Sequence, residues 1–223
     1  METNFATAAN APPVAQICRR LDGIPLAIEL AAAWVRVLSP VEIAEESESS
    51  LDFLNAQMRD LPERHRSIRA VFDHSWQMLS KEEQQVLGRL SVFRGGFQRQ
   101  AAEQVAGASL PVLSSLVIRS LLRRAATGRY DLHELIRQYA ASKLAEDPGE
   151  QHTAQERHSL YYLGLLEENG VKLQSHDQKE AVAELTGEMD NIRAAWDWSV
   201  VHQQFIPHSR VSVTLWYLFE LLN

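Results

Sequence analysis

The sequence predicts a mainly all-α protein: a helical domain, a winged helix-turn-helix with one short β-hairpin, and then α-solenoid helices of the TPR-like kind. Two observations carry this prediction. Apolar residues recur at helical spacing along nearly the whole chain, and they alternate only around residues 121–132. Helix stop and start signals divide the chain, and we place the domains at residues 1–63, 64–147 and 148–223.

The first domain is predicted to contain short helices. Val14–Leu21 carries one apolar stripe, and Gly23 suits the left-handed end of that helix. Pro25 suits the first turn of the next helix, where its missing N–H is not needed. The apolar residues that follow predict a buried helix to about Leu38, and Ser39 then predicts the N-cap of a third helix.

The second domain has the outline of a winged helix. Ser80-Lys81-Glu82-Glu83 is a capping box that opens an amphipathic helix. A tight turn at residues 94–97 precedes a helix that ends at Gly107, and an apolar helix follows over residues 110–120. The predicted hairpin forms the wing, and a long helix begins at His133.

The third domain is predicted to begin a helical repeat. Its last segment is apolar on nearly all sides and stops in mid-pattern, which predicts a solenoid that is cut short. We therefore expect the C-terminal helices to bind a protein partner, to self-associate or to fold back on the winged helix. Helices are expected near residues 153–169, 177–186, 188–203 and 208–222, with turns at Gly170, Gly187 and Pro207.

Charge is unevenly distributed along the chain, whose net charge is −7. Residues 1–63 hold 4 Lys/Arg against 10 Asp/Glu, giving −6. Residues 64–137 hold 12 against 6, giving +6, and residues 138–223 hold 6 against 13, giving −7. Two interpretations stay open: the basic middle faces phosphate or an acidic partner, or the three parts neutralise one another.

The sequence contains no pattern for catalysis or metal binding. None of the ten glycines is followed by lysine, so a phosphate-binding P-loop is absent. Cys18 is the single cysteine and lies on an apolar stripe, and the eight histidines lack metal-ligand spacing. We expect His152 and His158 on a solvated helix face. The chain alone is expected to be no enzyme and to hold no metal and no cofactor.

The longest apolar stretch is too short to cross a membrane. It runs from Ile24 to Leu38 and includes Glu29 and Arg36. The N-terminal residues lack the charged and then apolar pattern of a secretion signal. We therefore expect no membrane contact and a cytoplasmic location.

Two short motifs resemble a known family. Gly23-Ile24-Pro25 and Leu132-His133-Glu134 together are similar to the NB-ARC-type ATPases of the STAND class, especially large bacterial regulators. In that family the proline of Gly-x-Pro packs on bound nucleotide, and the histidine of Met-His-Asp reaches the β-phosphate of ADP. Here Leu132 and Glu134 replace the flanking residues while His133 is retained. The resemblance extends from about Ala11 onward, and the family's phosphate loop lies upstream of that segment.

The resemblance implies a regulatory fragment: a nucleotide-state lid and a protein-interaction solenoid in signal transduction or transcription regulation. Gly23, Pro25 and His133 would then contact ADP or ATP, although only beside a full ATPase core. Without that core, the chain is expected to bind both nucleotides very weakly or not at all. On local physics alone, each motif is also an ordinary helix end or start, and that interpretation stays open.

Two other functions stay open: a stand-alone protein-interaction adaptor and a winged-helix DNA-binding protein. A DNA reader needs polar and basic side chains on its third helix. Residues 110–120 instead offer one arginine and three serines among apolar residues. The wing arginines Arg123, Arg124 and Arg129 could touch phosphates, which would position the protein without reading sequence. Sequence-specific DNA binding is therefore not expected.

Overall fold

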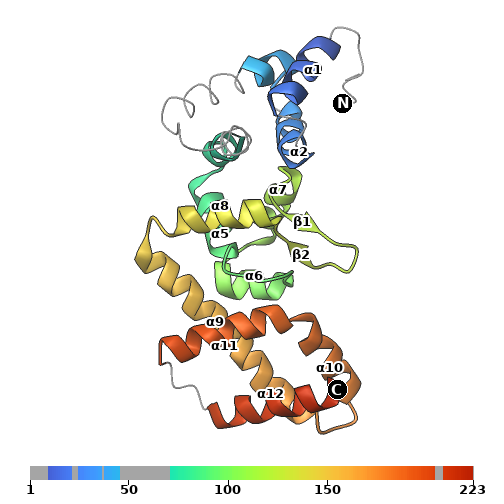
Figure 1. Cartoon of the computed structure of the whole chain (residues 1–223), viewed down its shortest axis with the longest axis vertical. Helices are drawn as coiled ribbons and strands as arrows, with labels where there is room; N and C mark the ends of the chain where they lie inside the picture. The colour runs from blue at the N-terminus through green and yellow to red at the C-terminus, as the bar shows by residue number, and fades with distance from the viewer. Residues whose placement is uncertain (1–9, 22–24, 37, 46–70, 204–207, 223) are drawn as a thin grey trace. The chain divides into compact units, whose positions relative to one another are not determined.

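The computed structural model describes residues 10–21, 25–36, 38–45, 71–203 and 208–222 (Figure 1). It is mostly helical with a small two-stranded sheet, which confirms the predicted fold class. The chain divides into two compact units. The first comprises Met1–Gln84 and Ser114–Leu122, and the second comprises Gln85–Leu113 and Arg123–Asn223. Gly23 and the boundary predicted near residue 63 lie outside the described residues.

The first unit begins with α1 (Ala11–Arg20) and α2 (Pro25–Ala33). Pro25 is the first residue of α2, as predicted. The helix expected to reach Leu38 tightens instead into the 3₁₀ turn η1 (Trp34–Arg36). Ser39 and Glu42 then form a reciprocal capping box, in which each backbone N–H donates to the other side chain, at 2.7 and 3.3 Å.

A buried tryptophan links two helical segments of the first unit. Trp34 is 5% exposed, and its indole Nε1–H donates to Ser75 Oγ at 3.2 Å. The Trp34 ring also lies 4.2 Å, centroid to centroid, from the ring of His74. This polar partner allows the indole to be buried without losing a hydrogen bond. Residues 40–45 and 71–77 are also helical.

The second predicted capping box is confirmed at the start of α5 (Lys81–Leu90). The N–H of Ser80 donates to the Glu83 carboxylate at 2.7 Å, and the N–H of Glu83 donates to Ser80 Oγ at 3.2 Å. Glu83 also accepts a hydrogen bond from the Ser115 hydroxyl. That serine lies in α7 (Leu110–Ile118), so Glu83 joins the two helices.

The predicted hairpin is present as β1 (Arg123–Arg124) and β2 (Tyr130–Asp131), paired antiparallel. An isolated bridge adds Phe97 to its edge: Phe97 and Tyr130 exchange two backbone hydrogen bonds of 2.8 Å. Within the described residues this is the only sheet. The helix before α7, α6 (Arg99–Ala106), ends on Gly107 with a positive φ of 69°, as predicted.

The C-terminal part of the second unit is built on the long helix α9 (Pro148–Lys172), which α11 (Met189–Val201) and α12 (His208–Leu222) both contact (Figure 1). The turn predicted at Gly170 is wrong, because α9 continues through that residue. A Cβ at Gly170 would lie 2.6 Å from Thr214 Oγ1. Glycine is needed there because α12 approaches closely.

Two further helices complete the second unit: α8 (Glu134–Leu144) and α10 (Gln178–Gly187). Both contact α9. Asp147 caps α9, accepting 3.1 Å hydrogen bonds from the N–H groups of Gly149 and Glu150, so α9 begins earlier than predicted. No single helix among the described residues is long and apolar enough to span a membrane, although α6 and α7 together pass the same test of length and composition as a bent pair.

Candidate functional site

A cavity of about 350 Å³, lined by three arginines, one histidine and two carboxylates, lies at the start of α8 in the second unit. Cationic and imidazole side chains gather there from three segments: the turn after α5, the strand β1 and the first turns of α8. The cavity is lined by Phe93, Arg94, Gly95, Arg123, Asp131, Leu132, His133, Glu134 and Arg137. We call it the α8 pocket.

His133 is held in one orientation by its own helix. It is the N-cap of α8 rather than its first helical residue, and its Nδ1 accepts a hydrogen bond of 3.2 Å from the N–H of Leu135. An acceptor Nδ1 in a neutral imidazole requires the proton on Nε2. His133 therefore presents an N–H donor on the side of the ring opposite its cap.

Arg94 and Arg137 supply two guanidinium groups to the pocket. Arg94 Nη1 donates to backbone carbonyls just after α5, including Ser91 O at 3.0 Å and Phe93 O at 3.1 Å. Burial, and next the positive charge of Arg137, lower the pKa of Arg94. Two like charges within electrostatic reach of each other favour an anion between them.

Glu134 offsets part of this positive charge. Its carboxylate accepts hydrogen bonds from Arg137 Nε at 2.8 Å and Nη2 at 2.5 Å, and from Gln138 Nε2 at 2.7 Å. These bonds, led by those from Arg137, lower the pKa of Glu134 to about 2. This bidentate pair uses the Nε and Nη2 edge of Arg137, so a ligand in the pocket would have to bind that guanidinium through Nη1.

The structure places the predicted nucleotide contacts in different units. His133 lines the α8 pocket of the second unit. Pro25 starts α2 in the first unit and is exposed, while Gly23 lies outside the described residues. Sequence reasoning missed Arg94 and Arg137 as pocket residues. A local signal existed for Arg137, which lies four residues after His133 and therefore on the same side of the helix start.

The exposed side of α7 has a different character. Leu110 and Ile118 are each 49% exposed, whereas Val112, Leu113 and Leu116 are buried. Ser114 is exposed, and no basic side chain occurs between the helix bounds. This helix therefore offers apolar contact area rather than groups that hydrogen-bond to base edges.

One of the three wing arginines is paired with groups of the protein itself. Arg129 forms an ion pair with Glu188, and its Nη2 donates to Gly96 O at 2.6 Å and Gly187 O at 3.2 Å. The expectation that Arg129 could touch phosphate stays a prediction, and such a contact would compete with these bonds. Arg123 and Arg124 are both exposed on β1.

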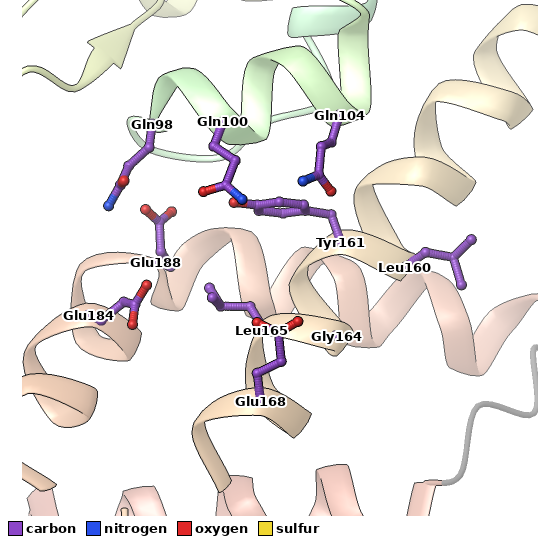
Figure 2. Close-up of a pocket in the computed structure, with 10 residues that line it drawn as sticks. All are labelled: Gln98, Gln100, Gln104, Leu160, Tyr161, Gly164, Leu165, Glu168, Glu184 and Glu188. Atoms are coloured by element: carbon purple, nitrogen blue, oxygen red, sulfur yellow. The ribbon is translucent and has the colours of Figure 1, made fainter. Parts of the chain in front are cut away.

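A second cavity of about 270 Å³ is acidic (Figure 2). Gln98, Gln100 and Gln104 of the α6 segment face Tyr161 across it, with three glutamates on the opposite side (Figure 2). Burial, and next the charges of Glu188, Glu184 and Glu168, raise the pKa of Tyr161. Such a lining disfavours an anion, and among the described residues no cluster of side chains suits a metal ion.

Comparison with known proteins identifies the middle of the chain. Residues 79–145 match the family described as "Winged helix-turn-helix domain". This match lies within the segment 64–147 predicted to be a winged helix.

Several mycobacterial proteins are similar to most of the chain. A Mycobacterium tuberculosis (strain H37Rv) protein named "Putative HTH-type transcriptional regulator" is 40% identical over 200 residues, which cover 85% of this chain and 22% of that protein. A Mycobacterium bovis protein of the same description shows the same values. An uncharacterized M. tuberculosis protein is 35% identical over 159 residues, covering 66% of this chain and 40% of that protein. No solved structure matches with significance.

The chain spans about a fifth of the length of the regulators that it resembles. These matches support the winged-helix DNA-binding alternative more directly than they support an ATPase fragment, since no ATPase family is among them. The chain thus contains a winged helix-turn-helix domain and is homologous to proteins named as HTH-type transcriptional regulators.

Proposed function

We propose that the chain is the regulatory winged-helix segment of a nucleotide-switched transcription regulator of the STAND class. The α8 pocket binds the diphosphate of ADP that an ATPase core holds elsewhere in a longer protein. Binding there favours the closed state, and its loss favours the open one. The C-terminal helices bind a protein partner, and the segment itself catalyses no reaction.

One observation carries this proposal: three side chains that can donate hydrogen bonds, His133, Arg94 and Arg137, line one cavity. His133 offers an Nε2–H fixed by its cap, and Arg94 and Arg137 offer guanidinium groups that lie within electrostatic reach of each other. Charge-assisted donors of this kind are the usual partners of phosphate oxygens. The pocket therefore fits a diphosphate by donor type, and its three arginines outnumber its two carboxylates, Asp131 and Glu134.

The length of the relatives also supports the proposal. The chain corresponds to 22% of the proteins named as transcriptional regulators. Their remaining length leaves ample room for a nucleotide-binding core. The length argument applies to the relatives. For the present chain, the support is the resemblance of Leu132-His133-Glu134 to Met-His-Asp.

Direct DNA binding is the second candidate, and the winged-helix match together with the names of the relatives favours it. In that case the exposed Arg123 and Arg124 of β1 contact phosphates beside α7. The apolar exposed side of α7 speaks against base reading, because Leu110 and Ile118 offer no hydrogen bond to a base edge.

Protein partners of the C-terminal helices are proposed from exposed apolar side chains. On α12, Val211 and Leu218 are buried, whereas Val213 is 57% exposed and Trp216 is 63% exposed. If the chain self-associates through α12, Trp216→Ser should increase the monomer fraction. Light scattering would detect this as a lower average molar mass. An unchanged monomer in both proteins would remove self-association from the proposal.

The first experiment compares pyrophosphate, ADP and duplex DNA as ligands of the 223-residue chain, using isothermal titration and fluorescence anisotropy. We expect pyrophosphate and ADP to bind with dissociation constants on the order of millimolar. Arg94→Met should weaken both by about tenfold, as expected for loss of one charge-assisted contact. Arg99→Met, which removes the same charge outside the pocket, should leave both unchanged.

Two results would contradict the proposal. One is pyrophosphate affinity that is the same in Arg94→Met, Arg99→Met and the original chain. The other is tight duplex binding that Arg124→Met weakens while pyrophosphate has no effect, which would favour the DNA-binding candidate. Salt must be held constant throughout, because phosphate contacts are strongly salt-dependent.

A further inference from the structure

We infer that Asn191 of α11 is a positioning residue, which ties the turn forming one wall of the α8 pocket to the first helices of the C-terminal repeat. A movement of α11 then alters the pocket. This inference rests on the proposed function, because it assigns a route by which the repeat regulates that same site.

The carboxamide of Asn191 is fully used in bonds to three residues. Asn191 is 1% exposed. Its Oδ1 accepts a 2.7 Å hydrogen bond from the backbone N–H of Arg94, and its Nδ2 donates to Gly96 O at 3.0 Å and to a Glu188 oxygen at 3.1 Å. One side chain of α11 therefore fixes both ends of the turn at residues 94–96.

This turn is part of the pocket itself. Phe93, Arg94 and Gly95 line the cavity, and the backbone of Arg94 is the group that Asn191 holds. Gly95 has a positive φ of 69°, and a Cβ there would lie 3.5 Å from an oxygen of Asp190, the neighbour of Asn191. The wall of the pocket and the start of α11 are thus in direct contact.

Glu188 provides a second tie, from the same part of the chain to the wing. Its side chain is 4% exposed and forms an ion pair with Arg129. A Glu188 oxygen also accepts a 3.2 Å hydrogen bond from the Tyr162 hydroxyl. Burial, and next the charge of Glu188, raise the pKa of Tyr162, so the phenol remains a donor. Every oxygen of this buried carboxylate is therefore paired, as its burial requires.

His158 of α9 also contacts Asn191, at the same Oδ1 atom that accepts from Arg94. His158 is 3% exposed, so its predicted position on a solvated face is wrong, whereas His152 is exposed as predicted. His158 Nε2 lies 3.3 Å from Asn191 Oδ1, and its ring packs edge-on against Phe93, with centroids 5.3 Å apart. Asn191 is thereby clamped between the turn and α9, within one unit of the structure.

The experiment compares Asn191→Ala with Asn169→Ala. Asn169 is an equally buried asparagine, 1% exposed on α9, and bonds only to Leu165 O of its own helix among the described residues. Hydrogen exchange of the Arg94 amide and pyrophosphate affinity are measured for both variants. For Asn191→Ala we expect about tenfold faster exchange at Arg94 and several-fold weaker pyrophosphate binding, as loss of one buried hydrogen bond implies.

A conservative variant separates positioning from general destabilisation. Asn191→Gln keeps both the acceptor for the Arg94 N–H and the donor for Gly96 O, and adds one methylene at a site that is 1% exposed. We expect it to retain slow exchange at Arg94 while it weakens pyrophosphate binding less than Asn191→Ala does. This variant also keeps the test decisive if Asn191→Ala does not fold.

Two outcomes would overturn the inference. One is Arg94 exchange in Asn191→Ala that equals that of Asn169→Ala. The other is pyrophosphate affinity that is unchanged in Asn191→Ala although Arg94 exchanges faster. Failure of the proposed function has a separate signature, since the original chain would then show no pyrophosphate binding, whatever residue 191 is.

Discussion

The N-terminal ends of α7 and α8 are built alike and differ in what surrounds them. Each is capped by a side-chain acceptor: Ser109 Oγ accepts from the N–H of Val112 at 3.4 Å, and His133 Nδ1 accepts from Leu135 at 3.2 Å. Around α8 other segments add Arg94 and Arg123, and α8 itself adds Arg137, which is ion-paired with Glu134. Along α7 the exposed residues are apolar or small.

The difference teaches that a cap alone does not make a binding site. Both helix starts have exposed N–H groups and the same partial positive charge. Only at α8 does a distant turn deliver Arg94, and that turn is held by Asn191. The chemistry of the α8 pocket therefore depends on tertiary contacts that α7 lacks, and the following predictions test this dependence from the largest expected effect to the smallest.

The turn that lines the α8 pocket packs against the buried, neutral His158. This histidine should make the free energy of unfolding fall in acid. Burial, and to a lesser degree the charge of Arg94, lower the pKa of His158 from 6.5 to about 4. The unfolded chain binds a proton that the folded chain does not between these pKa values. Stability should thus fall as pH drops from about 6.5 to about 4, by roughly 3 kcal/mol in total.

His158→Gln tests this linkage, since glutamine does not titrate. Chemical denaturation at pH 7 and pH 4 should show a smaller acid-induced loss in the variant, by roughly the same 3 kcal/mol. The carboxylates contribute equally to both proteins, so the difference isolates His158. An identical pH dependence in the two proteins would show that His158 titrates normally.

Removal of pocket charge should sharpen the comparison next. Arg137→Met leaves Arg94 and His133 in place but removes the guanidinium that Glu134 orients. We expect about tenfold weaker pyrophosphate binding, an effect near 1.4 kcal/mol. Arg119→Met, just after α7, is the matched control, and it should leave the pyrophosphate affinity measured by titration calorimetry unchanged. Equal losses of pyrophosphate affinity in both variants would mean that pyrophosphate responds to the overall charge of the chain and does not bind in the pocket.

The two caps should contribute equally to stability but not to binding. Ser109→Ala and His133→Ala should each lower the free energy of unfolding by about 1 kcal/mol. His133→Asn keeps a cap acceptor, so it should retain stability while it loses the imidazole donor and weakens pyrophosphate binding. Thermal unfolding and titration of the three variants measure both effects. Retained binding in His133→Asn would exclude His133 as a phosphate contact.

Changes on the exposed side of α7 should have the smallest effect. Leu110→Lys and Ile118→Lys replace side chains that are each 49% exposed. We expect changes in stability within about 0.5 kcal/mol, and no change in pyrophosphate binding. A loss of several kcal/mol in chemical denaturation would instead reveal that these side chains are covered.

The local elements of the fold were predictable because their signals lie within a few residues. The capping box of Ser80 and Glu83, the helix start at Pro25 and the left-handed Gly107 each depend on neighbours in sequence. The same holds for the hairpin, whose alternating pattern is local. His133 could be singled out as a candidate for the same reason, since its motif spans three residues.

The remaining parts depend on contacts between distant segments. The sequence does not reveal that Arg129 forms an ion pair with Glu188, which is 59 residues away. It also does not reveal that His158 is buried and lies within hydrogen-bond distance of Asn191 in α11. Gly170 is typical of a turn in sequence, but it is required by the approach of α12 to α9. Helical periodicity predicts which face of a helix is buried, but it does not predict which segment packs against that face. For this reason the sequence does not predict that Arg94 lines the pocket.

The most direct test of the account is the ¹⁵N spectrum of the His133 imidazole during titration with pyrophosphate. We predict that Nε2 carries the ring proton while Nδ1 accepts from Leu135, and that the Nε2 signal shifts and saturates at millimolar pyrophosphate. Duplex DNA of equal phosphate concentration should shift it less. A proton on Nδ1, or an Nε2 signal that pyrophosphate leaves unchanged while DNA shifts the amides of α7, would contradict the account.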